Sequence, residues 1–289
     1  MKRLELGRGD HHDRRVMSFS ENELAEYARF AGRLADAARI ESLARFRTGA
    51  AVVNKAGASF DPVTDADREA ERVLRALIEE AYPQHGILGE EFGAKAGAAP
   101  GEDKWRWVID PVDGTRAFMC GTTSWTTLIA LESAGAPVLG VIDQPFTDER
   151  WINAGGRTRY MHGGESRDVQ TSGLDDIAKA RVSTTDPLST GYFTDGEAAA
   201  FARVAKAAQV ARYSLDAYAY GLLSMGEIDL VIESGLQRYD YAALVPVIEG
   251  AGGVVTNWRG EAPGADERGE LIAAATPALH AAALELLAG

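Results

Sequence analysis

Two N-terminal segments place hydrophobic residues at helical spacing, and each opens with a capping pattern. Ser20 followed by Glu23 forms a capping box, and the apolar positions after it predict an amphipathic helix that extends to about Arg45. Thr64 is the predicted N-cap of a second helix, which Pro83 ends. The apolar positions of the two patterns are Leu24, Ala28, Ala31, Ala35 and Ala38 in the first and Ala70, Val73, Leu74, Leu77 and Ile78 in the second.

Short apolar runs bounded by glycine or polar residues follow the second helix. They are Gly86–Gly89, Trp107–Ile109, Thr126–Leu131, Val138–Ile142 and Trp151–Ala154. Runs of this kind predict strands, and we expect them to form a mostly antiparallel sheet.

From Arg181 onward, short strands alternate with helices, which indicates α/β layering. The predicted strands are Arg181–Thr184, Ile228–Ile232, Gly253–Thr256 and Leu271–Ala275, and the predicted helices are Gly196–Ala207, Asp216–Met225, Tyr241–Ala251 and Pro277–Leu287. The polar, glycine-rich segment Gly155–Ser172 marks the boundary between the halves. We therefore expect a disordered extension over residues 1–17, an N-terminal α+β subdomain over 18–160 and a C-terminal α/β subdomain over 161–289.

Composition and charge narrow the classes of function. Hydrophobic residues make up 46% of the chain and charged residues 25%, the balance of a globular protein with a core. The 30 basic and 43 acidic residues give a net charge of −13, which disfavours nucleic acid and anionic membranes as partners. The single cysteine, Cys120, forbids an intrachain disulfide. No apolar run approaches the ~18 residues of a membrane span and no signal-peptide pattern is present, so we expect a cytoplasmic protein.

Acidic residues gather at the ends of three predicted strands, in Gly89–Glu91, Asp110–Thr115 and Tyr239–Asp240. Carboxylates at strand ends are costly unless they are solvated or bind a metal. Asp110 and Asp113 lie beside the amides of Gly114 and Thr115, an arrangement suited to Mg²⁺-assisted phosphoryl chemistry. The alternative, that the two aspartates are turn and cap residues, explains this segment alone equally well. The other acidic clusters favour the metal.

The spacing of these residues separates the site from other phosphatase chemistries. An aspartyl-phosphate enzyme needs Asp-x-Asp at a strand end, whereas Asp110 and Asp113 are three residues apart. A cysteine phosphatase needs an arginine where Thr126 stands relative to Cys120. The five histidines form no paired metal-ligand motif, and the chain has no P-loop. The mechanism that remains is direct attack on the phosphate by metal-activated water.

Several segments resemble, in order along most of the chain, the signature blocks of the inositol monophosphatase family. The blocks are Asp61–Asp67, Gly89–Glu91, Trp107–Thr115, and Tyr239–Asp240 followed by Glu249–Gly253. Their joint occurrence is far more specific than any one block. The resemblance implies an α/β (α+β) fold, a five-layer αβαβα sandwich of the inositol monophosphatase and fructose-bisphosphatase type. It also implies a homodimer with two or three Mg²⁺ ions and lithium-sensitive hydrolysis of small phosphate monoesters.

The resemblance also assigns site residues by position. The metal ligands that it implies are Glu90, Asp110, the backbone carbonyl of Val112, Asp113 and Asp240. Thr115 and Asp61 match the pair that orients and deprotonates the attacking water, and the amides of Gly114 and Thr115 match the phosphate cradle. On this pattern Mg²⁺, rather than basic side chains, recruits the phosphate and activates the water.

Other stretches resemble the histidinol-phosphatase branch of the family, which acts on L-histidinol phosphate in histidine biosynthesis. They are Arg116–Phe118, Gly140–Phe146, Glu149–Trp151, Thr184–Pro187, Asp216–Gly221 and Tyr239–Leu244. That substrate carries an ammonium group, so we expect additional carboxylates near the leaving group. Asp216 and Glu233 are the candidates for substrate binding, although Asp216 fits a helix N-cap equally well. The alternatives are an inositol-1-monophosphatase, a phosphatase of sugar or nucleotide phosphates, and a non-catalytic metal-binding protein on the same scaffold.

Overall fold

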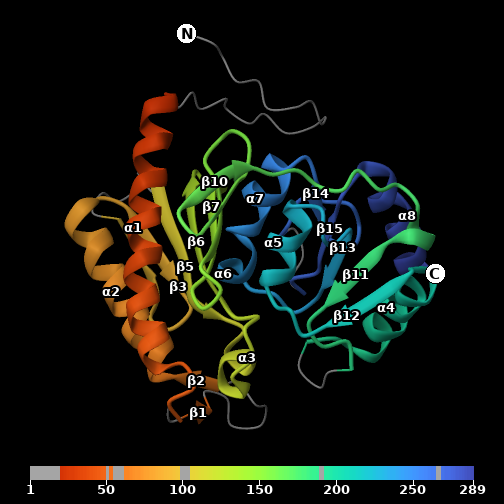
Figure 1. Ribbon diagram of the computed structural model, residues 1–289, viewed down its shortest axis with the longest axis horizontal. Coiled ribbons are helices and arrows are strands. Elements are labelled where there is room, and N and C mark those ends of the chain that lie inside the picture. The colour runs from red at the N-terminus through yellow and green to blue at the C-terminus, as the bar shows by residue number, and fades with distance from the viewer. Residues whose placement is uncertain (1–19, 50–51, 55–61, 98–104, 189–191, 265–267) are drawn as a thin grey trace.

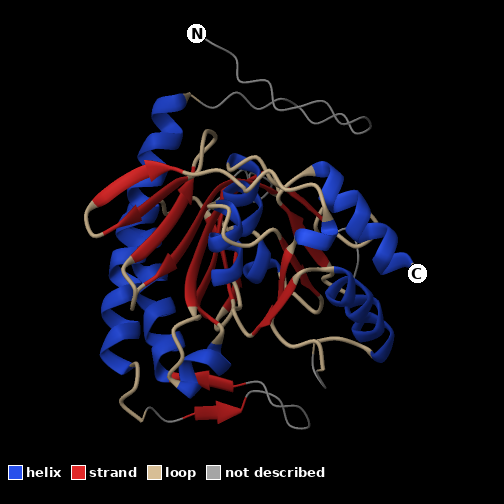
Figure 2. Ribbon diagram, turned by 45° about the vertical axis from the view of Figure 1, so that its right-hand side comes forward, coloured by secondary structure: helices blue, strands red, loops and turns tan. Residues whose placement is uncertain are grey.

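The computed structural model describes residues 20–49, 52–54, 62–97, 105–188, 192–264 and 268–289 (Figure 1). The predicted disordered extension over residues 1–17 lies outside this set. In the described part, five layers of helices and sheets alternate, as expected from the resemblance (Figures 1 and 2). None of the helices in these ranges is both long enough and apolar enough to cross a membrane.

The first two layers are a helix pair and an eight-stranded sheet. Both helices open with a reciprocal capping box, at Ser20 with Glu23 and at Thr64 with Asp67, so the predicted starts are confirmed. The helices are α1 (Glu21–Arg45) and α2 (Asp65–Ala81), and they cover the outer face of the sheet. The strands are β3 (Gly86–Gly89), β4 (Gly93–Lys95), β5 (Trp105–Asp113), β6 (Thr126–Ser133), β7 (Ala136–Gln144), β8 (Glu149–Asn153), β9 (Arg159–His162) and β10 (Glu165–Asp168).

The eight strands lie in the order β10-β9-β8-β7-β6-β5-β3-β4, and every neighbouring pair except β3 with β5 is antiparallel. The prediction of a mostly antiparallel sheet is therefore confirmed. Strands β9 and β10 fall within Gly155–Ser172, the segment expected to separate the halves, and extend the first sheet by a hairpin. The division at residue 160 remains a prediction.

The C-terminal half supplies the other three layers. A five-stranded sheet has the order β12-β11-β13-β15-β14, with parallel pairs on either side of β11 and antiparallel pairs on either side of β15. Its strands are β11 (Arg181–Thr184), β12 (Val210–Tyr213), β13 (Leu230–Glu233), β14 (Val254–Thr256) and β15 (Leu271–Ala274). Helices α5 (Tyr218–Ser224), α6 (Arg238–Tyr241) and α7 (Leu244–Gly250) lie between the sheets, and α4 (Asp195–Ala207) and α8 (Pro277–Ala288) cover the outer face. The sequence pattern missed β12 and α6, because the predicted helix Tyr241–Ala251 covers α7 but only the last residue of α6.

Short elements complete the fold. The two-stranded pair β1 (Val52–Asn54) and β2 (Pro62–Thr64) lies near α3 (Thr115–Cys120) at the lower edge in Figure 1. The 3-10 helix η1 (Ile177–Lys179) precedes β11 and contacts α8.

Strand β5 is buried on both faces, which explains its continuous apolar run. Trp107 and Ile109 pack into the core between the first sheet and α1 and α2, whereas Val108 packs into the central core between the two sheets. Because side chains alternate along a strand, Asp110 lies on the same side as Val108 and faces the central layer. The strand therefore delivers a carboxylate to the space between the two sheets.

Candidate active site

A cavity of about 380 Å³ lies between the two halves, where β5 passes into α3 and where β13 ends. Six carboxylates from four regions of the chain line it: Glu90, Asp110, Asp113, Asp216, Glu233 and Asp240. Val112, Gly114 and Thr115 line it as well. All the sequence-assigned site residues except Asp61 thus reach one cavity, and Asp61 lies outside the described residues.

One carboxylate cluster combines Asp110, Asp113 and Asp240, whose closest oxygens all lie within 4.8 Å of one another. Asp110 is 2% exposed, and its Oδ1 accepts a hydrogen bond from the amide of Val112 at 3.0 Å. Asp113 Oδ2 accepts a hydrogen bond from the amide of Ala217 at 2.8 Å, which ties the end of β5 to the start of α5. Burial and the neighbouring carboxylates raise the pKa of Asp110 and of Asp113 well above their ordinary values.

A second cluster combines Asp67, Glu90 and Glu91 within the same 4.8 Å limit. Glu71 of α2 shapes the turn after β3, because its carboxylate accepts the amides of Glu91 at 2.7 Å and Phe92 at 3.2 Å. A Cβ on Gly89 would come within 2.1 Å of Glu71 Oε1, so the close approach requires glycine here. The buried glutamate of the helix therefore positions the acidic turn against the end of β5.

Asp67 is the functional candidate that the sequence analysis missed. Thr115 Oγ1 donates a hydrogen bond to Asp67 Oδ1 at 3.2 Å, while Asp67 Oδ2 accepts the amide of Thr64 at 2.9 Å. Asp67 is fully buried, and burial raises its pKa. Asp67 was visible in the sequence as the last residue of the Asp61–Asp67 block, but the family resemblance gave the partnership with Thr115 to Asp61.

Gly114 forms the floor of the turn between β5 and α3. Its backbone has a φ of 81°, and a Cβ would lie 2.9 Å from Asp216 Cγ. Both the left-handed conformation and the close approach therefore require glycine. The turn brings the start of α3 directly against the carboxylate of Asp216.

Asp216 and Glu233 form the C-terminal wall of the cavity. Asp216 has a φ of 49°, an unusual conformation for a residue with a side chain, and its Oδ2 accepts a hydrogen bond from Ser124 Oγ at 3.3 Å. Glu233 Oε1 accepts both the amide and the hydroxyl of Thr185 at 2.8 Å. Burial raises the pKa of Glu233 to about 8, although the hydrogen bonds from Thr185 oppose the shift.

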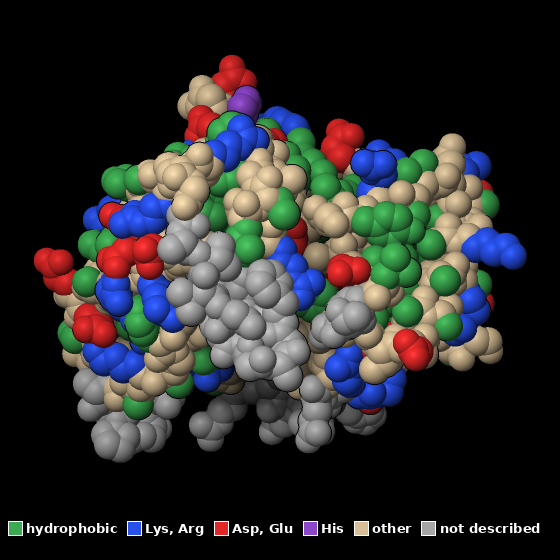
Figure 3. Space-filling model, turned by 90° about the horizontal axis from the view of Figure 1, so that it is seen from below, with side chains coloured by type: hydrophobic (Ala, Val, Ile, Leu, Met, Phe, Trp, Pro, Cys, Tyr) green, Lys and Arg blue, Asp and Glu red, His purple; other side chains and the backbone are tan. Residues whose placement is uncertain are grey.

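The donors around the cavity fit a hard divalent cation. The two clusters offer only carboxylate oxygens, and Asp110 and Asp113 are buried like charges that neutralising cations would stabilise. Arg116 is the one Lys or Arg among the described residues that line the cavity. On the lower face of the molecule, acidic and basic side chains are interspersed where they are coloured by type (Figure 3). The groups that attract a phosphate must therefore lie in the cavity itself.

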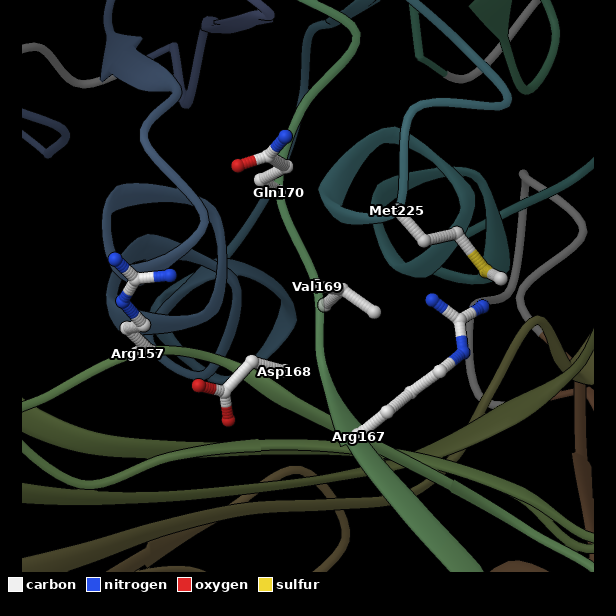
Figure 4. Close-up of a pocket in the computed structure, with 6 residues that line it drawn as sticks. All are labelled: Arg157, Arg167, Asp168, Val169, Gln170 and Met225. Atoms are coloured by element: carbon white, nitrogen blue, oxygen red, sulfur yellow. The ribbon is translucent and has the colours of Figure 1, made fainter.

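A second hollow of about 280 Å³ lies where the chain leaves β10 (Figure 4). Its lining consists of Arg157, Arg167, Asp168, Val169, Gln170 and Met225. The guanidinium groups of Arg157 and Arg167 lie on opposite sides of the extended segment that runs through Val169. They do not converge on one anion, so the acidic cavity is the stronger candidate site.

The five-layer fold and the carboxylate-lined cavity fit the class of metal-dependent phosphatases. The chain belongs to the inositol monophosphatase family, because the model named "Inositol monophosphatase family" matches residues 23–288. Members of the family depend on metal ions and act on small phosphate monoesters.

Three relatives illustrate the range of the family. The chloroplastic bifunctional phosphatase IMPL2 of Arabidopsis thaliana is 41% identical over 84% of this chain and 67% of its own length. A histidinol-phosphatase of Mycobacterium tuberculosis is 32% identical over 79% of this chain and 87% of its own length. The solved structure of an inositol monophosphatase from Zymomonas mobilis has a TM-score of 0.80 and 38% identity, covering 94% of this chain and 100% of the other.

Proposed function

We propose that the protein is a Mg²⁺-dependent histidinol-phosphatase, which converts L-histidinol phosphate and water to L-histidinol and phosphate in histidine biosynthesis. The observation that carries this proposal is the wall formed by Asp216 and Glu233 beside the cluster of Asp110, Asp113 and Asp240. Two carboxylates beyond the metal cluster suit a leaving group that bears an ammonium. Similarity to the Mycobacterium tuberculosis histidinol-phosphatase supports the same choice.

In this proposal Glu90, Asp110, Asp113, Asp240 and the carbonyl of Val112 hold two or three Mg²⁺ ions. When bound, the ions neutralise the phosphoryl charge and activate water as the nucleophile. We further propose that the enzyme is a cytoplasmic homodimer, sensitive to lithium, that engages neither nucleic acid nor membrane.

The residues of the chain supply orientation and proton transfer. Because the Thr115 hydroxyl donates to Asp67 Oδ1, its oxygen is directed to accept a hydrogen bond from the attacking water. The buried carboxylate of Asp67 then receives the proton, and its raised pKa suits that task. The amides of Gly114 and Thr115 contact the phosphoryl oxygens, and Asp216 and Glu233 pair with the ammonium of the leaving alcohol.

A substrate panel with Mg²⁺ tests the function. The wild-type protein should hydrolyse L-histidinol phosphate with a kcat/KM about ten- to a hundredfold above that for inositol 1-phosphate, the discrimination given by one buried charge-assisted contact. Asp216→Ala and Glu233→Ala should erode this preference more than they reduce hydrolysis of p-nitrophenyl phosphate. Equal or better hydrolysis of inositol 1-phosphate would favour an inositol-1-monophosphatase, and no turnover of any ester would favour a non-catalytic metal-binding protein.

A further inference from the structure

Tyr220 of α5 is a polar side chain of the cavity that the mechanism above does not use. It lines the cavity, its side chain is only 2% exposed, and its hydroxyl has no hydrogen-bond partner among the described residues. Tyr218, two residues earlier, donates its hydroxyl to Glu149 at 2.7 Å. A buried hydroxyl without a partner destabilises the fold, so its persistence beside a cavity suggests a partner that arrives with the ligand.

Tyr220 lies close to the proposed reacting groups. Asp216, which precedes α5, and Tyr220, which belongs to it, both line the cavity. The ionisable groups that act most strongly on the phenol are Glu233, Asp113 and Asp240, each from a different part of the cavity wall. Burial and these three carboxylates raise the pKa of Tyr220 well above its ordinary value, so the hydroxyl remains protonated.

The cavity wall therefore combines two kinds of hydrogen-bonding group. Asp216 and Glu233 only accept hydrogen bonds when they are ionised, which for Glu233 requires a pH near or above 8, whereas the hydroxyl of Tyr220 keeps a proton to donate. An alcohol that carries both an ammonium and a neutral acceptor atom, such as a ring nitrogen, would satisfy both kinds at once. Aryl phosphates and simple aminoalkyl phosphates would not.

We propose that Tyr220 is a specificity-determining residue, whose hydroxyl donates a hydrogen bond to a neutral acceptor atom on the alcohol part of the substrate while Asp216 and Glu233 pair with its ammonium. This inference rests on the proposed function and narrows its substrate class to amino-alcohol phosphates with a second, uncharged heteroatom.

Tyr220→Phe tests the inference, with Tyr218→Phe as the matched control on the same helix. The kcat/KM for L-histidinol phosphate, which has both groups, is compared with that for phosphoethanolamine, which has the ammonium only, and with that for p-nitrophenyl phosphate. Tyr220→Phe should lower the value for L-histidinol phosphate about threefold to tenfold more than the values for the other two, the range for one neutral hydrogen bond. Tyr218→Phe should change all three equally. A uniform loss with Tyr220→Phe would overturn the proposal.

Thermal unfolding without substrate gives a second readout. Removing a hydroxyl that lacks a protein partner should leave the Tm unchanged or raise it, whereas Tyr218→Phe breaks a hydrogen bond to Glu149 and should lower it. A Tm loss in Tyr220→Phe as large as that in Tyr218→Phe would show a structural hydroxyl and would also overturn the proposal.

The two proposals fail separately. If the wild-type protein prefers inositol 1-phosphate to L-histidinol phosphate, the proposed function is wrong. The role of Tyr220 is tested separately, by the effect of Tyr220→Phe on the kcat/KM for L-histidinol phosphate divided by the kcat/KM for phosphoethanolamine. This ratio can be measured whenever the protein hydrolyses both substrates.

Discussion

The hydroxyl of Thr115 donates a hydrogen bond to Oδ1 of Asp67 at 3.2 Å, across 48 residues of sequence. The other oxygen of the same carboxylate accepts the amide of Thr64, the N-cap of α2. The first turn of α2 thus ends against the first residue of α3. A single carboxylate stabilises a helix start and orients a hydroxyl of the cavity.

This contact predicts which aspartate serves as the base. Asp67→Asn should lower kcat by about a hundred- to ten-thousandfold, the usual contribution of a general base. Asn has one acceptor oxygen, and the amide of Thr64 occupies it, so the Thr115 hydroxyl loses Asp67 as an acceptor and turns to the carbonyl of Val112, 3.3 Å away. Thr115→Ala should lower kcat as well while leaving Mg²⁺ affinity largely intact, as measured by titration.

Asp61→Asn is the direct comparison, because the family resemblance assigned the same role to Asp61. We expect it to retain most of the wild-type kcat. If Asp61→Asn lowers kcat as much as Asp67→Asn does, Asp61 rather than Asp67 would be identified as the base.

Asp113→Asn should separate activity from stability. Turnover should fall at least about a hundredfold, since a proposed metal ligand is lost. In EDTA the variant should nevertheless have a higher Tm than the wild type, because one of the buried like charges is removed while the amide of Ala217 keeps an acceptor.

Added Mg²⁺ completes the measurement. Saturation at about 100 times the Kd should stabilise the wild type by about 2.7 kcal/mol, and Asp113→Asn should gain much less. An equal gain in Tm with Mg²⁺ in the two proteins would argue against Asp113 as a ligand.

The ionisation of Glu233 predicts a pH-dependent substrate preference. Its pKa is raised to about 8, so the fraction that is ionised and able to pair with an ammonium grows as the pH rises from 6 toward 8. The kcat/KM for L-histidinol phosphate, divided by that for p-nitrophenyl phosphate, should therefore increase over this range. The ratio cancels titrations of the metal site that both substrates share. Burial also raises the pKa of Asp216, the second carboxylate proposed to pair with the ammonium, to about 6, so Asp216 contributes mainly below pH 7. In Glu233→Gln the increase between pH 7 and pH 8 should therefore disappear, and an unchanged slope in that interval would exclude Glu233 as the group responsible.

His85 predicts how stability depends on acid. Its ring stacks on Tyr82 and Trp105, and Nδ1 accepts the indole N–H of Trp107 at 3.1 Å. Burial lowers the pKa of His85 from 6.5 to about 4, so the folded state binds fewer protons than the unfolded state between these values. The contribution of this pKa shift to the free energy of unfolding is complete above pH 6.5 and is lost as the pH falls from 6.5 toward 4.

His85→Asn keeps an acceptor but cannot titrate. After allowance for the part of the ring that solvent reaches, the free energy of unfolding of the wild type should fall between pH 7 and pH 5 by about 1 kcal/mol more than that of the variant. Denaturant unfolding at the two pH values measures the difference. Parallel losses in the two proteins would assign the acid sensitivity to other groups.

Local patterns in the sequence determined the parts of this protein whose causes lie within a few residues. Ser20 and Thr64 start α1 and α2 because each side chain and its third following residue satisfy free amides of the first turn. The run from Trp107 to Ile109 predicted a buried strand, and the strand alternation delivers Asp110 to the cavity side. The sequence also showed directly that acidic residues gather in Gly89–Glu91, Asp110–Thr115 and Tyr239–Asp240.

Only the tertiary structure decided which distant groups meet. Asp67 faces Thr115 because α2 packs across β5, and Glu71 of the same helix shapes the turn that carries Glu90. The orphan hydroxyl of Tyr220 is equally invisible in sequence, where it is one of two tyrosines on a short helix. Residue spacing constrains neighbours along one element, whereas contacts between elements depend on the packing of whole layers, which no local pattern contains.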